Sequence, residues 1–360
     1  MAASFSGSVK FVYSAGRNQC VAAATYRRCA DSEEKSIVIE FCGPRRVLST
    51  SPYNGGCRED ITAVYNFDCK DEETGYSDLR TDTYEGELRL TACDLGLDPE
   101  STTGLSTAAQ MHNAAMATAC FENVSVTTIA TGGINVNAVR AGDPASYCER
   151  NGEFIVFQPG TINMILLFSC KLSPGILTRA LVTATEAKAA AVGELMVPSR
   201  YSHGIATGSG TDGVILSADL SANIELTDAG THAKLGELIA QSVKKAVKEA
   251  LFHQTGMCSA YQHSVMQRLE QFEISDEQLW RACCKRRGSI DRTLYREQLH
   301  KLDRDGLAVS IISMCLHLLD EANWGLLSTA EVRHAFLAVR GMNLQPMLED
   351  ILLCLEDILR

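Results

Sequence analysis

The sequence has no excess of positive charge. It carries 33 Lys and Arg residues against 44 Asp and Glu residues, which gives a net charge of -11 over 360 residues. A protein that binds the phosphate backbone of nucleic acid needs a basic face. The basic run at residues 285–287 is short and is typical of a solvated loop. We therefore expect no nucleic-acid partner.

Long apolar runs are also missing. No stretch approaches the roughly 18 apolar residues that a membrane-spanning helix needs. The first 20 residues, MAASFSGSVKFVYSAGRNQC, lack the long apolar core of a signal peptide. The sequence therefore predicts no membrane partner and a cytoplasmic location.

Paired cysteine spacing is absent, although the chain contains 14 Cys residues. No pair has the C-x-x-C spacing, and Cys283 and Cys284 are adjacent, which suits neither an ordinary disulfide nor paired zinc ligation. A chain of this length builds a core without disulfides. We expect most of these thiols to be small buried apolar groups, and nothing in their spacing supports a metal site.

Common catalytic signatures are missing as well. The chain has no GxxxxGK[ST] phosphate loop, no GxSxG nucleophile elbow and no HExxH zinc motif. Any active site must therefore be recognised from other residues.

The distribution of Gly and Trp divides the chain. Of the 27 Gly residues, 22 precede residue 250, whereas both Trp residues, Trp280 and Trp324, follow it. This pattern predicts one large mixed domain at residues 1–255 and a small helical domain at residues 256–360.

The periodicity of the first domain mixes strands and helices. The fold class predicted is α/β, or α+β, with a layered mixed sheet and helices, followed by a small all-α C-terminal domain. Three helices are expected, one of them opening after Ser173 with Pro174 at its first position. The other two helices expected are residues 102–120 and 231–251. The strands expected are residues 8–14, 36–42 and 87–97, one strand each within residues 122–143 and 203–220, and two strands around Pro159-Gly160 within residues 153–173.

Four loops of the first domain are rich in Gly, Asn, Thr and Asp. Such loops supply backbone N–H donors and short polar side chains that hold amides or stabilise an oxyanion. Each loop by itself is more typical of a structural turn, but four in one domain favour a ligand cleft. They are residues 53–56, 131–133, 160–163 and 207–212.

At this point six long blocks of the sequence become informative together. The blocks are VLSTSPYNGG (47–56), LGLDPESTTGLSTAAQM (95–111), NAVRAGDP (137–144), GTINMILLFSCKLSPG (160–175), ALVTATEAKAAAVGELMVPSRYSHGIATGSGTD (180–212) and AGTHAKLGELIAQSVKKAVKEAL (229–251). In their residues and their order they resemble the adenosylcobinamide amidohydrolase family of corrinoid salvage, over about residues 35–252.

The resemblance implies hydrolysis of the amide that joins the aminopropanol arm to the corrin ring of adenosylcobinamide, with adenosylcobyric acid as product. The partner is then a corrinoid small molecule, and the cobalt belongs to that substrate, so no cofactor of the protein is expected. The rival hypothesis is a corrinoid-binding or regulatory protein that kept the fold and lost catalysis.

Amide hydrolysis needs an activated nucleophile, donors for the oxyanion and an acid for the departing amine. On the matching positions, the hypothesis assigns the nucleophile or water activation to Thr211, Asp212 or Glu186, and the proton shuttle to His232. Substrate binding falls to Asn54, Gly55, Gly56, Thr161 and Asn163, with Lys188 as an electrostatic partner. In the alternative hypothesis that these residues are structural, the side chains of Asn54 and Asp212 only stabilise turns by hydrogen bonds.

The chain departs from the family pattern at a few places. Ser209 stands where Thr is usual, His203 stands where Gly is frequent, and the match around Asn66 is weaker.

The C-terminal region lies outside this pattern and resembles an EF-hand loop at residues 320–331. Asp320, Gly325 and Glu331 occupy its first, sixth and twelfth positions. Ala322 and Trp324 stand where oxygen ligands are required, and the upstream loop around Gly288, Ser289 and Ile290 has none. We expect a degenerate EF-hand-like pair that binds no calcium and serves in packing or as the docking site of a protein partner.

Overall fold

A computed structural model describes residues 8–14, 20–28, 34–70, 79–145, 161–288 and 290–359. The chain forms two compact units. The first comprises Met1–Glu194 with Ala206–Met257, and the second comprises Leu195–Ile205 with Cys258–Arg360. The second unit therefore contains residues 195–205 in addition to the C-terminal region.

The first unit contains two mixed sheets. The five-stranded sheet has the order β1-β2-β3-β6-β7, in which β6 and β7 are parallel and the other pairs antiparallel. Its strands are β1 (Ser8–Ser14), β2 (Cys20–Arg28), β3 (Glu34–Glu40), β6 (Ala63–Asp68) and β7 (Thr102–Thr107).

The six-stranded sheet has the order β5-β4-β14-β11-β9-β8, in which β11 and β14 are parallel neighbours. β11 is buried at every position, which agrees with its sequence INMILLF, where Asn163 is the one polar residue. The strands are β4 (Arg45–Ser49), β5 (Gly56–Arg58), β8 (Ala115–Phe121), β9 (Val124–Gly132), β11 (Ile162–Phe168) and β14 (Gly213–Asp219).

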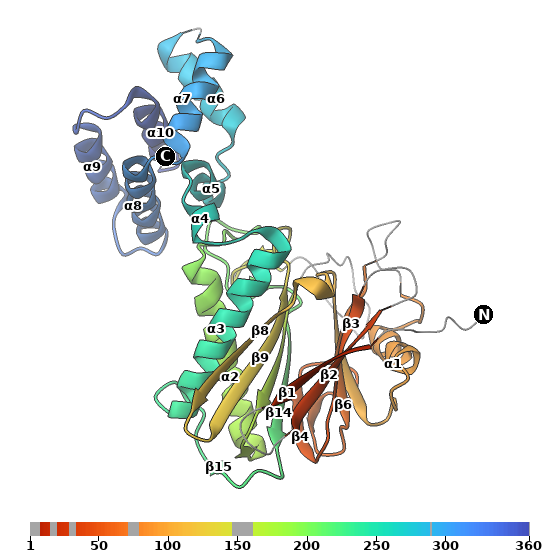
Figure 1. The fold of residues 1–360 in the computed structure, drawn as a ribbon. Helices are drawn as coiled ribbons and strands as arrows, with labels where there is room; N and C mark the ends of the chain where they lie inside the picture. Colours follow the sequence, from red (N-terminus) through yellow and green to blue (C-terminus); the bar gives the residue numbers. More distant parts are fainter. Residues whose placement is uncertain are drawn as a thin grey trace. The chain divides into compact units, whose positions relative to one another are not determined.

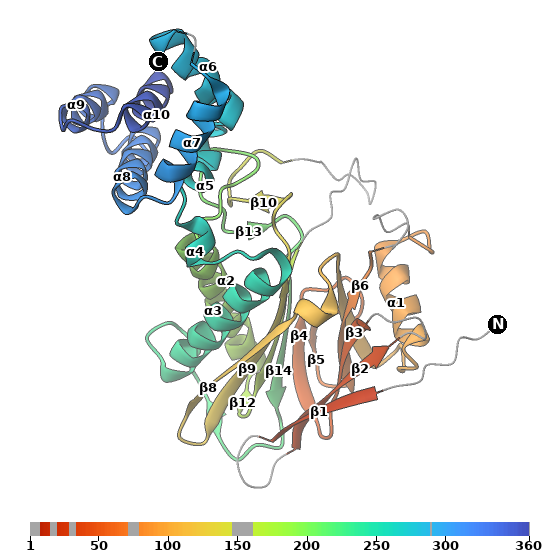
Figure 2. The same ribbon diagram turned by 45° about the horizontal axis from the view of Figure 1, so that its top comes forward.

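The two sheets pack against each other and helices cover their outer faces (Figures 1 and 2). Apolar residues from both sheets form a shared core, including Ile39 of β3, Ile165 of β11 and Ile215 of β14. Helix α1 (Tyr84–Asp94) covers the five-stranded sheet, where Leu88 packs with Tyr65. Helices α2 (Pro174–Glu194) and α3 (Lys234–Thr255) pack together on the six-stranded sheet. The predicted layered fold class is confirmed.

Short elements complete the first unit. A 3-10 turn, η1 (Met111–Asn113), precedes β8. Two small two-stranded ladders pair β10 (Ala138–Val139) with β13 (Gly208–Ser209), and β12 (Lys171–Leu172) with β15 (Glu225–Leu226).

Two elements of the first unit differ from the sequence prediction. The segment predicted as a strand at residues 87–97 is mostly helix α1, whose N-cap Thr83 accepts a hydrogen bond from the backbone N–H of Gly86. The segment predicted as one Ala-rich helix at residues 102–120 is two strands, β7 and most of β8. Small residues suit β7 because Gly104 lies against the Tyr65 ring, where any Cβ would overlap the ring. The strand expected just before Thr161 lies outside the described residues.

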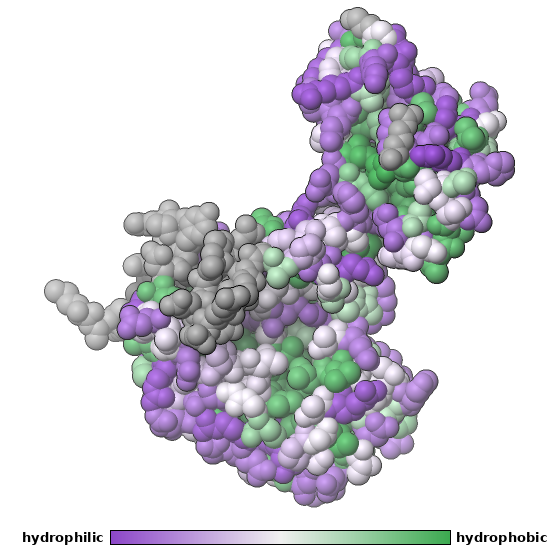
Figure 3. All heavy atoms as spheres, turned by 180° about the vertical axis from the view of Figure 1, so that it is seen from behind, coloured by the Kyte–Doolittle hydropathy of each residue, from purple (hydrophilic) through white to green (hydrophobic). Residues whose placement is uncertain are grey.

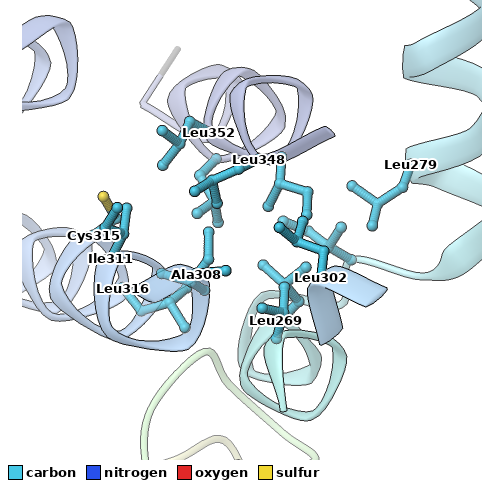
Figure 4. Close-up of a cluster of buried hydrophobic side chains, with 14 of the residues drawn as sticks. Leu269, Leu279, Leu302, Ala308, Ile311, Cys315, Leu316, Leu348 and Leu352 are labelled. Carbon is cyan, nitrogen blue, oxygen red and sulfur yellow. The ribbon is translucent and has the colours of Figure 1, made fainter. Parts of the chain in front are cut away.

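In its described part, the second unit has only helices as regular secondary structure after residue 258. Their apolar faces meet in a core that includes Leu269, Leu302, Ile311 and Leu348 (Figure 4). The helices are α4 (Ser259–Gln262), α5 (Val265–Leu269), η2 (Glu270–Phe272), α6 (Asp276–Arg287), α7 (Arg292–Asp303), α8 (Gly306–Asn323), α9 (Thr329–Arg340) and α10 (Pro346–Asp357).

Helices α8 and α9 flank the segment that resembles an EF-hand loop. Residues 320–323 form the last turn of α8, so the first third of the expected loop is helical. Asp320 accepts a hydrogen bond from Gln271, and Glu331 forms a capping box with Ser328 at the start of α9. Both carboxylates are therefore engaged in packing and capping. Ser289, in the expected partner loop, lies outside the described residues.

Hydrophobic side chains appear among hydrophilic ones on the surface of the helical unit (Figure 3). A protein partner for this unit remains a prediction. The large exposed apolar residues from residue 290 onward are Leu294, Leu307, Met314, Trp324, Leu326, Leu337, Met342 and Ile358.

Within the described residues, no helix is both long enough and apolar enough to cross a membrane.

Candidate functional site

Polar residues gather where the parallel strands β11 and β14 begin. Thr161 immediately precedes β11, and Asp212 immediately precedes β14. The register pairs Asn163 with Gly213, so these residues lie side by side at one edge of the six-stranded sheet. Three of the four predicted loops therefore meet at this edge. Ile162 pairs with Gly132 and the Gly133 N–H donates to the Thr161 carbonyl, so residues 131–133 adjoin residues 161–163 and 207–212.

Asp212 is the centre of this group. Its Oδ1 accepts hydrogen bonds from the backbone N–H of Ile162 at 2.9 Å and from the Ser209 hydroxyl at 2.6 Å. Its Oδ2 accepts from the Ser209 backbone N–H at 3.1 Å and pairs with the ammonium group of Lys188. The carboxylate thus joins the 208–212 loop to the start of β11 and to helix α2.

Lys188 and Asp212 form a buried ion pair. Their side chains are only 9% and 10% exposed. Helix α2 presents Lys188 towards the sheet because this residue lies on the buried face with Ala184 and Ala191. A buried charge is costly unless it is paired, so each member of the pair holds the other in place.

Gly208 allows this pair to form. A Cβ at residue 208 would overlap both Asp212 Oδ2 and Lys188 Nζ. At Gly210 the same addition would meet no atom within 4 Å. Only the first glycine is required by a close approach of backbone to side chains.

Asn163 was predicted to bind substrate, but both polar atoms of its side chain form hydrogen bonds within the protein. Its Nδ2 donates to Asn66 Oδ1 and to the Ser106 carbonyl, both at 2.8 Å. Its Oδ1 accepts from the Gly213 backbone N–H at 3.1 Å. The side chain is 2% exposed. Asn163 therefore joins β11 to the neighbouring sheet and fixes the start of β14.

Asn66 takes part in the site network although the sequence signal there was weak. Its Nδ2 donates to the Thr131 hydroxyl at 2.9 Å, in addition to its bond with Asn163. Thr161 donates to the Thr211 carbonyl at 2.6 Å. The network is buried and connects β6, β9 and β11. A polar Asn inside the apolar strand AVYNFD was the one signal in the sequence for it.

The side chain of Asn54 stabilises the turn formed by the Asn54-Gly55-Gly56 loop. Asn54 lies in the left-handed region with φ 49°, and its Nδ2 donates to the carbonyls of Pro99 and Thr102 at 2.9 and 2.8 Å. Gly55 is needed because a Cβ there would overlap the Ser51 carbonyl. Gly56 pairs with Ser49, which pairs with Ile215 of β14, so the loop lies two strands from β14. Its contacts fit the structural alternative for Asn54.

Glu186 and His232 lie apart from the Lys188–Asp212 pair. Glu186 is exposed on α2, two residues from the buried Lys188. His232 is exposed and precedes Lys234, whose ammonium lies 4.9 Å from the centre of the Phe121 ring. Phe121 pairs with Val124 at the start of β9. Asp212 accepts a hydrogen bond from Ile162, and Ile162 pairs with Gly132 at the end of β9.

The nine residues of β9 correspond to a length of roughly 26 Å at 3.3 Å for each of eight steps. His232 and Asp212 therefore lie near opposite ends of the sheet. The structure brings together Thr161, Asn163, Lys188, Thr211 and Asp212, and it adds Asn66 and Ser209 to them.

Residues 208–213 have the G-x-G-x-x-G spacing of a dinucleotide-binding loop. That loop requires glycines that lead from a strand into a helix N-terminus, where the pyrophosphate binds. Here they lead from β13 into strand β14, so the helix N-terminus is missing. No group of three or more potential metal ligands occurs among the described residues.

A known protein family matches the part of the chain that contains this site. The sequence profile described as adenosylcobinamide amidohydrolase (CbiZ) matches residues 18–259. The chain belongs to this family. The family match covers the six-stranded sheet with the Lys188–Asp212 pair, and it ends shortly after α3.

Two individual proteins can be compared with this adenosylcobinamide amidohydrolase family member. The "Uncharacterized protein MJ1613" of Methanocaldococcus jannaschii is 34% identical over 237 residues, which are 62% of this chain and 88% of the relative. The crystal structure of the PH0078 protein from Pyrococcus horikoshii OT3 covers 69% of this chain and 83% of its own, with 11% identity and a TM-score of 0.33. That likeness is too low to inform the fold.

Proposed function

We propose that the chain hydrolyses the amide between the aminopropanol arm and the corrin ring of adenosylcobinamide, giving adenosylcobyric acid and the amino alcohol. Membership of an amidohydrolase family and the corrinoid substrate that the family implies support this reaction. The single observation that carries the site is the buried Lys188–Asp212 pair within the region of the family match.

Amide hydrolysis develops negative charge on the carbonyl oxygen and requires a proton on the departing nitrogen. A buried ammonium group beside a rigid loop can meet both needs, because its charge is little screened and its position is fixed. In this proposal, Lys188 stabilises the oxyanion and supplies the proton. Asp212 holds the ammonium in position and orients the Ser209 hydroxyl.

The balance of the reaction is simple. The oxygen of a water molecule bonds to the carbonyl carbon, the C–N bond breaks, and the nitrogen takes a proton from Lys188 and leaves as an amine. The proton that the water molecule loses returns to Lys188, so the ammonium group is restored. Ser209 places its hydroxyl group beside Asp212 and accepts a hydrogen bond from the Thr211 backbone N–H, so this hydroxyl can orient that water molecule. The cobalt stays within the corrinoid, and the reaction needs no cofactor of the protein.

The test is product analysis with the full chain. Purified protein is incubated with adenosylcobinamide, and the reaction is examined for adenosylcobyric acid and aminopropanol. Appearance of both products, and their loss in Lys188→Met, supports the proposal. A change in the corrinoid absorbance spectrum without any product would instead support a corrinoid-binding protein that lost catalysis.

A further inference from the structure

Residues 195–205 connect the two elements that hold the Lys188–Asp212 pair. Helix α2, which carries Lys188, ends at Glu194, and Ala206 begins the approach to β13 and Asp212. The connecting segment does not belong to the compact unit that contains the pair. It belongs to the helical unit, together with residues 258–360.

Within the helical unit, His203 of this segment is held by residues 271 and 272. Gln271 Nε2 donates to the His203 carbonyl at 2.8 Å, and His203 Nδ1 lies 3.1 Å from the Gln271 carbonyl. The His203 ring stacks on Phe272 with centroids 5.2 Å apart and planes inclined by 18°. Three contacts therefore fix the backbone and side chain of one residue.

Gln271 is itself fixed in the helical core. Its side chain is buried, and its Nε2 also donates to Asp320 Oδ1 of α8 at 2.7 Å. If the segment moves away, this buried amide loses its bond to the His203 carbonyl, and a buried donor left without that partner is costly. The helical core thus opposes displacement of His203.

The connecting segment is closed on itself as well. Ser199 N–H donates to the Gly204 carbonyl at 2.8 Å, and Pro198 forms a β-bridge with Ile205. A closed segment transmits the position of His203 to Ile205, which is bonded to Ala206. Residues 206–212, which form the loop of Asp212, follow directly after Ile205.

We propose that Gln271 and His203 are positioning residues for the Lys188–Asp212 pair, so that the C-terminal helical unit sets the geometry of the candidate site. We call this set of contacts, made by His203, Gln271 and Phe272, the His203 clasp. The proposal rests on the proposed function for its effect on turnover. It assigns a task to the helical unit, most of which lies beyond the family match at residues 18–259.

The first test measures how fast the backbone amides of residues 206–212 exchange their hydrogens with solvent. Amide hydrogen exchange is followed for residues 206–212 in the full chain and in Gln271→Ala and His203→Ala. The Ser209 N–H, which bonds to Asp212, should exchange at least about threefold faster in both variants, with amides of β9 unchanged. His203 is exposed, so its replacement leaves no cavity. Gln345→Ala is the control, because Gln345 is exposed in the same unit and its side chain makes no cap hydrogen bond.

Folding of the variants is checked by the fluorescence of Trp280 and Trp324, both of which lie in the helical unit. Wild-type exchange of residues 206–212 in folded Gln271→Ala and His203→Ala would overturn the proposal. If Gln271→Ala does not fold, His203→Ala alone decides.

The second test measures turnover of adenosylcobinamide. Both clasp variants should lose about fivefold in kcat with little change in KM, because the substrate-binding surface is kept while the pair is misplaced. Gln345→Ala should match the wild type. Unchanged kcat in both clasp variants counts against the proposal. Absence of turnover in the wild type contradicts the proposed function instead, and the exchange experiment still decides whether the clasp holds the loop.

Discussion

Asp212 and Asp219 lie at opposite ends of the same strand, and each carboxylate pairs with a buried cation. Asp212 precedes β14 and pairs with Lys188, while Asp219 ends β14 and lies 3.7 Å from Arg45. Each also accepts a hydrogen bond of 2.6 Å from a nearby serine hydroxyl, Ser209 or Ser221. The two ends of β14 therefore offer nearly the same local arrangement, but only one lies in the candidate site.

This resemblance provides a matched control for the proposed reaction. Asp212→Asn removes the charge that holds Lys188 and should lower turnover of adenosylcobinamide by about 10²-fold, the size typical of a lost acid–base group. Asp219→Asn removes the equivalent charge at the far end and should lower stability but leave turnover per folded molecule near the wild-type value. Equal losses of turnover in the two variants would show that the effect of Asp212 is structural.

Two glycines of the 208–212 loop test the geometry of the pair. Gly208→Ala places a methyl group where Asp212 Oδ2 and Lys188 Nζ now lie, so the pair must separate. These atoms are the ends of flexible side chains, and we expect a loss of turnover of about tenfold or more with only a small change in melting temperature. Gly210→Ala meets no atom within 4 Å and should behave as the wild type. Steady-state kinetics with thermal unfolding separates the two effects.

The positions of Glu186 and His232 predict little effect on chemistry. Both side chains are exposed, and His232 lies near the Phe121 end of the six-stranded sheet. Glu186→Ala and His232→Ala should therefore retain turnover within about twofold, in contrast to the roughly 10²-fold loss of a missing proton shuttle. A loss of that size in His232→Ala would place the reacting amide elsewhere than at Lys188.

Buried thiols predict that the helical unit loses stability in alkali. Burial raises the pKa of Cys283 and of Cys315 to about 12, from 9.0 for a free thiol. Below pH 9 both thiols are protonated in the folded and unfolded chains, and their contribution to stability is fully present. Above pH 9 the unfolded chain releases these protons first, so stability falls as the pH rises towards 12.

At pH 10 this loss amounts to about 1 kcal/mol for each thiol. Unfolding followed by the fluorescence of Trp280 and Trp324 at pH 8 and pH 10 measures it. The double variant Cys283→Ala Cys315→Ala should show a smaller difference between the two pH values than the wild type. An equal difference would assign the alkaline instability to other groups.

Periodicity and cap residues predicted the elements whose own residues decide their structure. Helix α3 follows the apolar positions of residues 231–251, and α2 begins at Pro174 as the pair Ser173-Pro174 indicated. The predictions failed where packing overrides propensity. Residues 102–107 form a buried strand because Gly104 and its neighbours fit against Tyr65 in the adjacent strand, a contact between residues far apart in the chain.

The sequence by itself determined the family, the layered fold class and the loops that surround the site, because these depend on residue types in a fixed order. Only the tertiary structure decided which of those residues act together. It paired Lys188 with Asp212 and occupied every polar atom of Asn163 within the protein. It also placed His232 near the far end of the sheet and put His203 in the helical unit. The physical reason is that hydrogen bonds and ion pairs form between side chains that are close in space, and spacing along the chain does not fix that closeness.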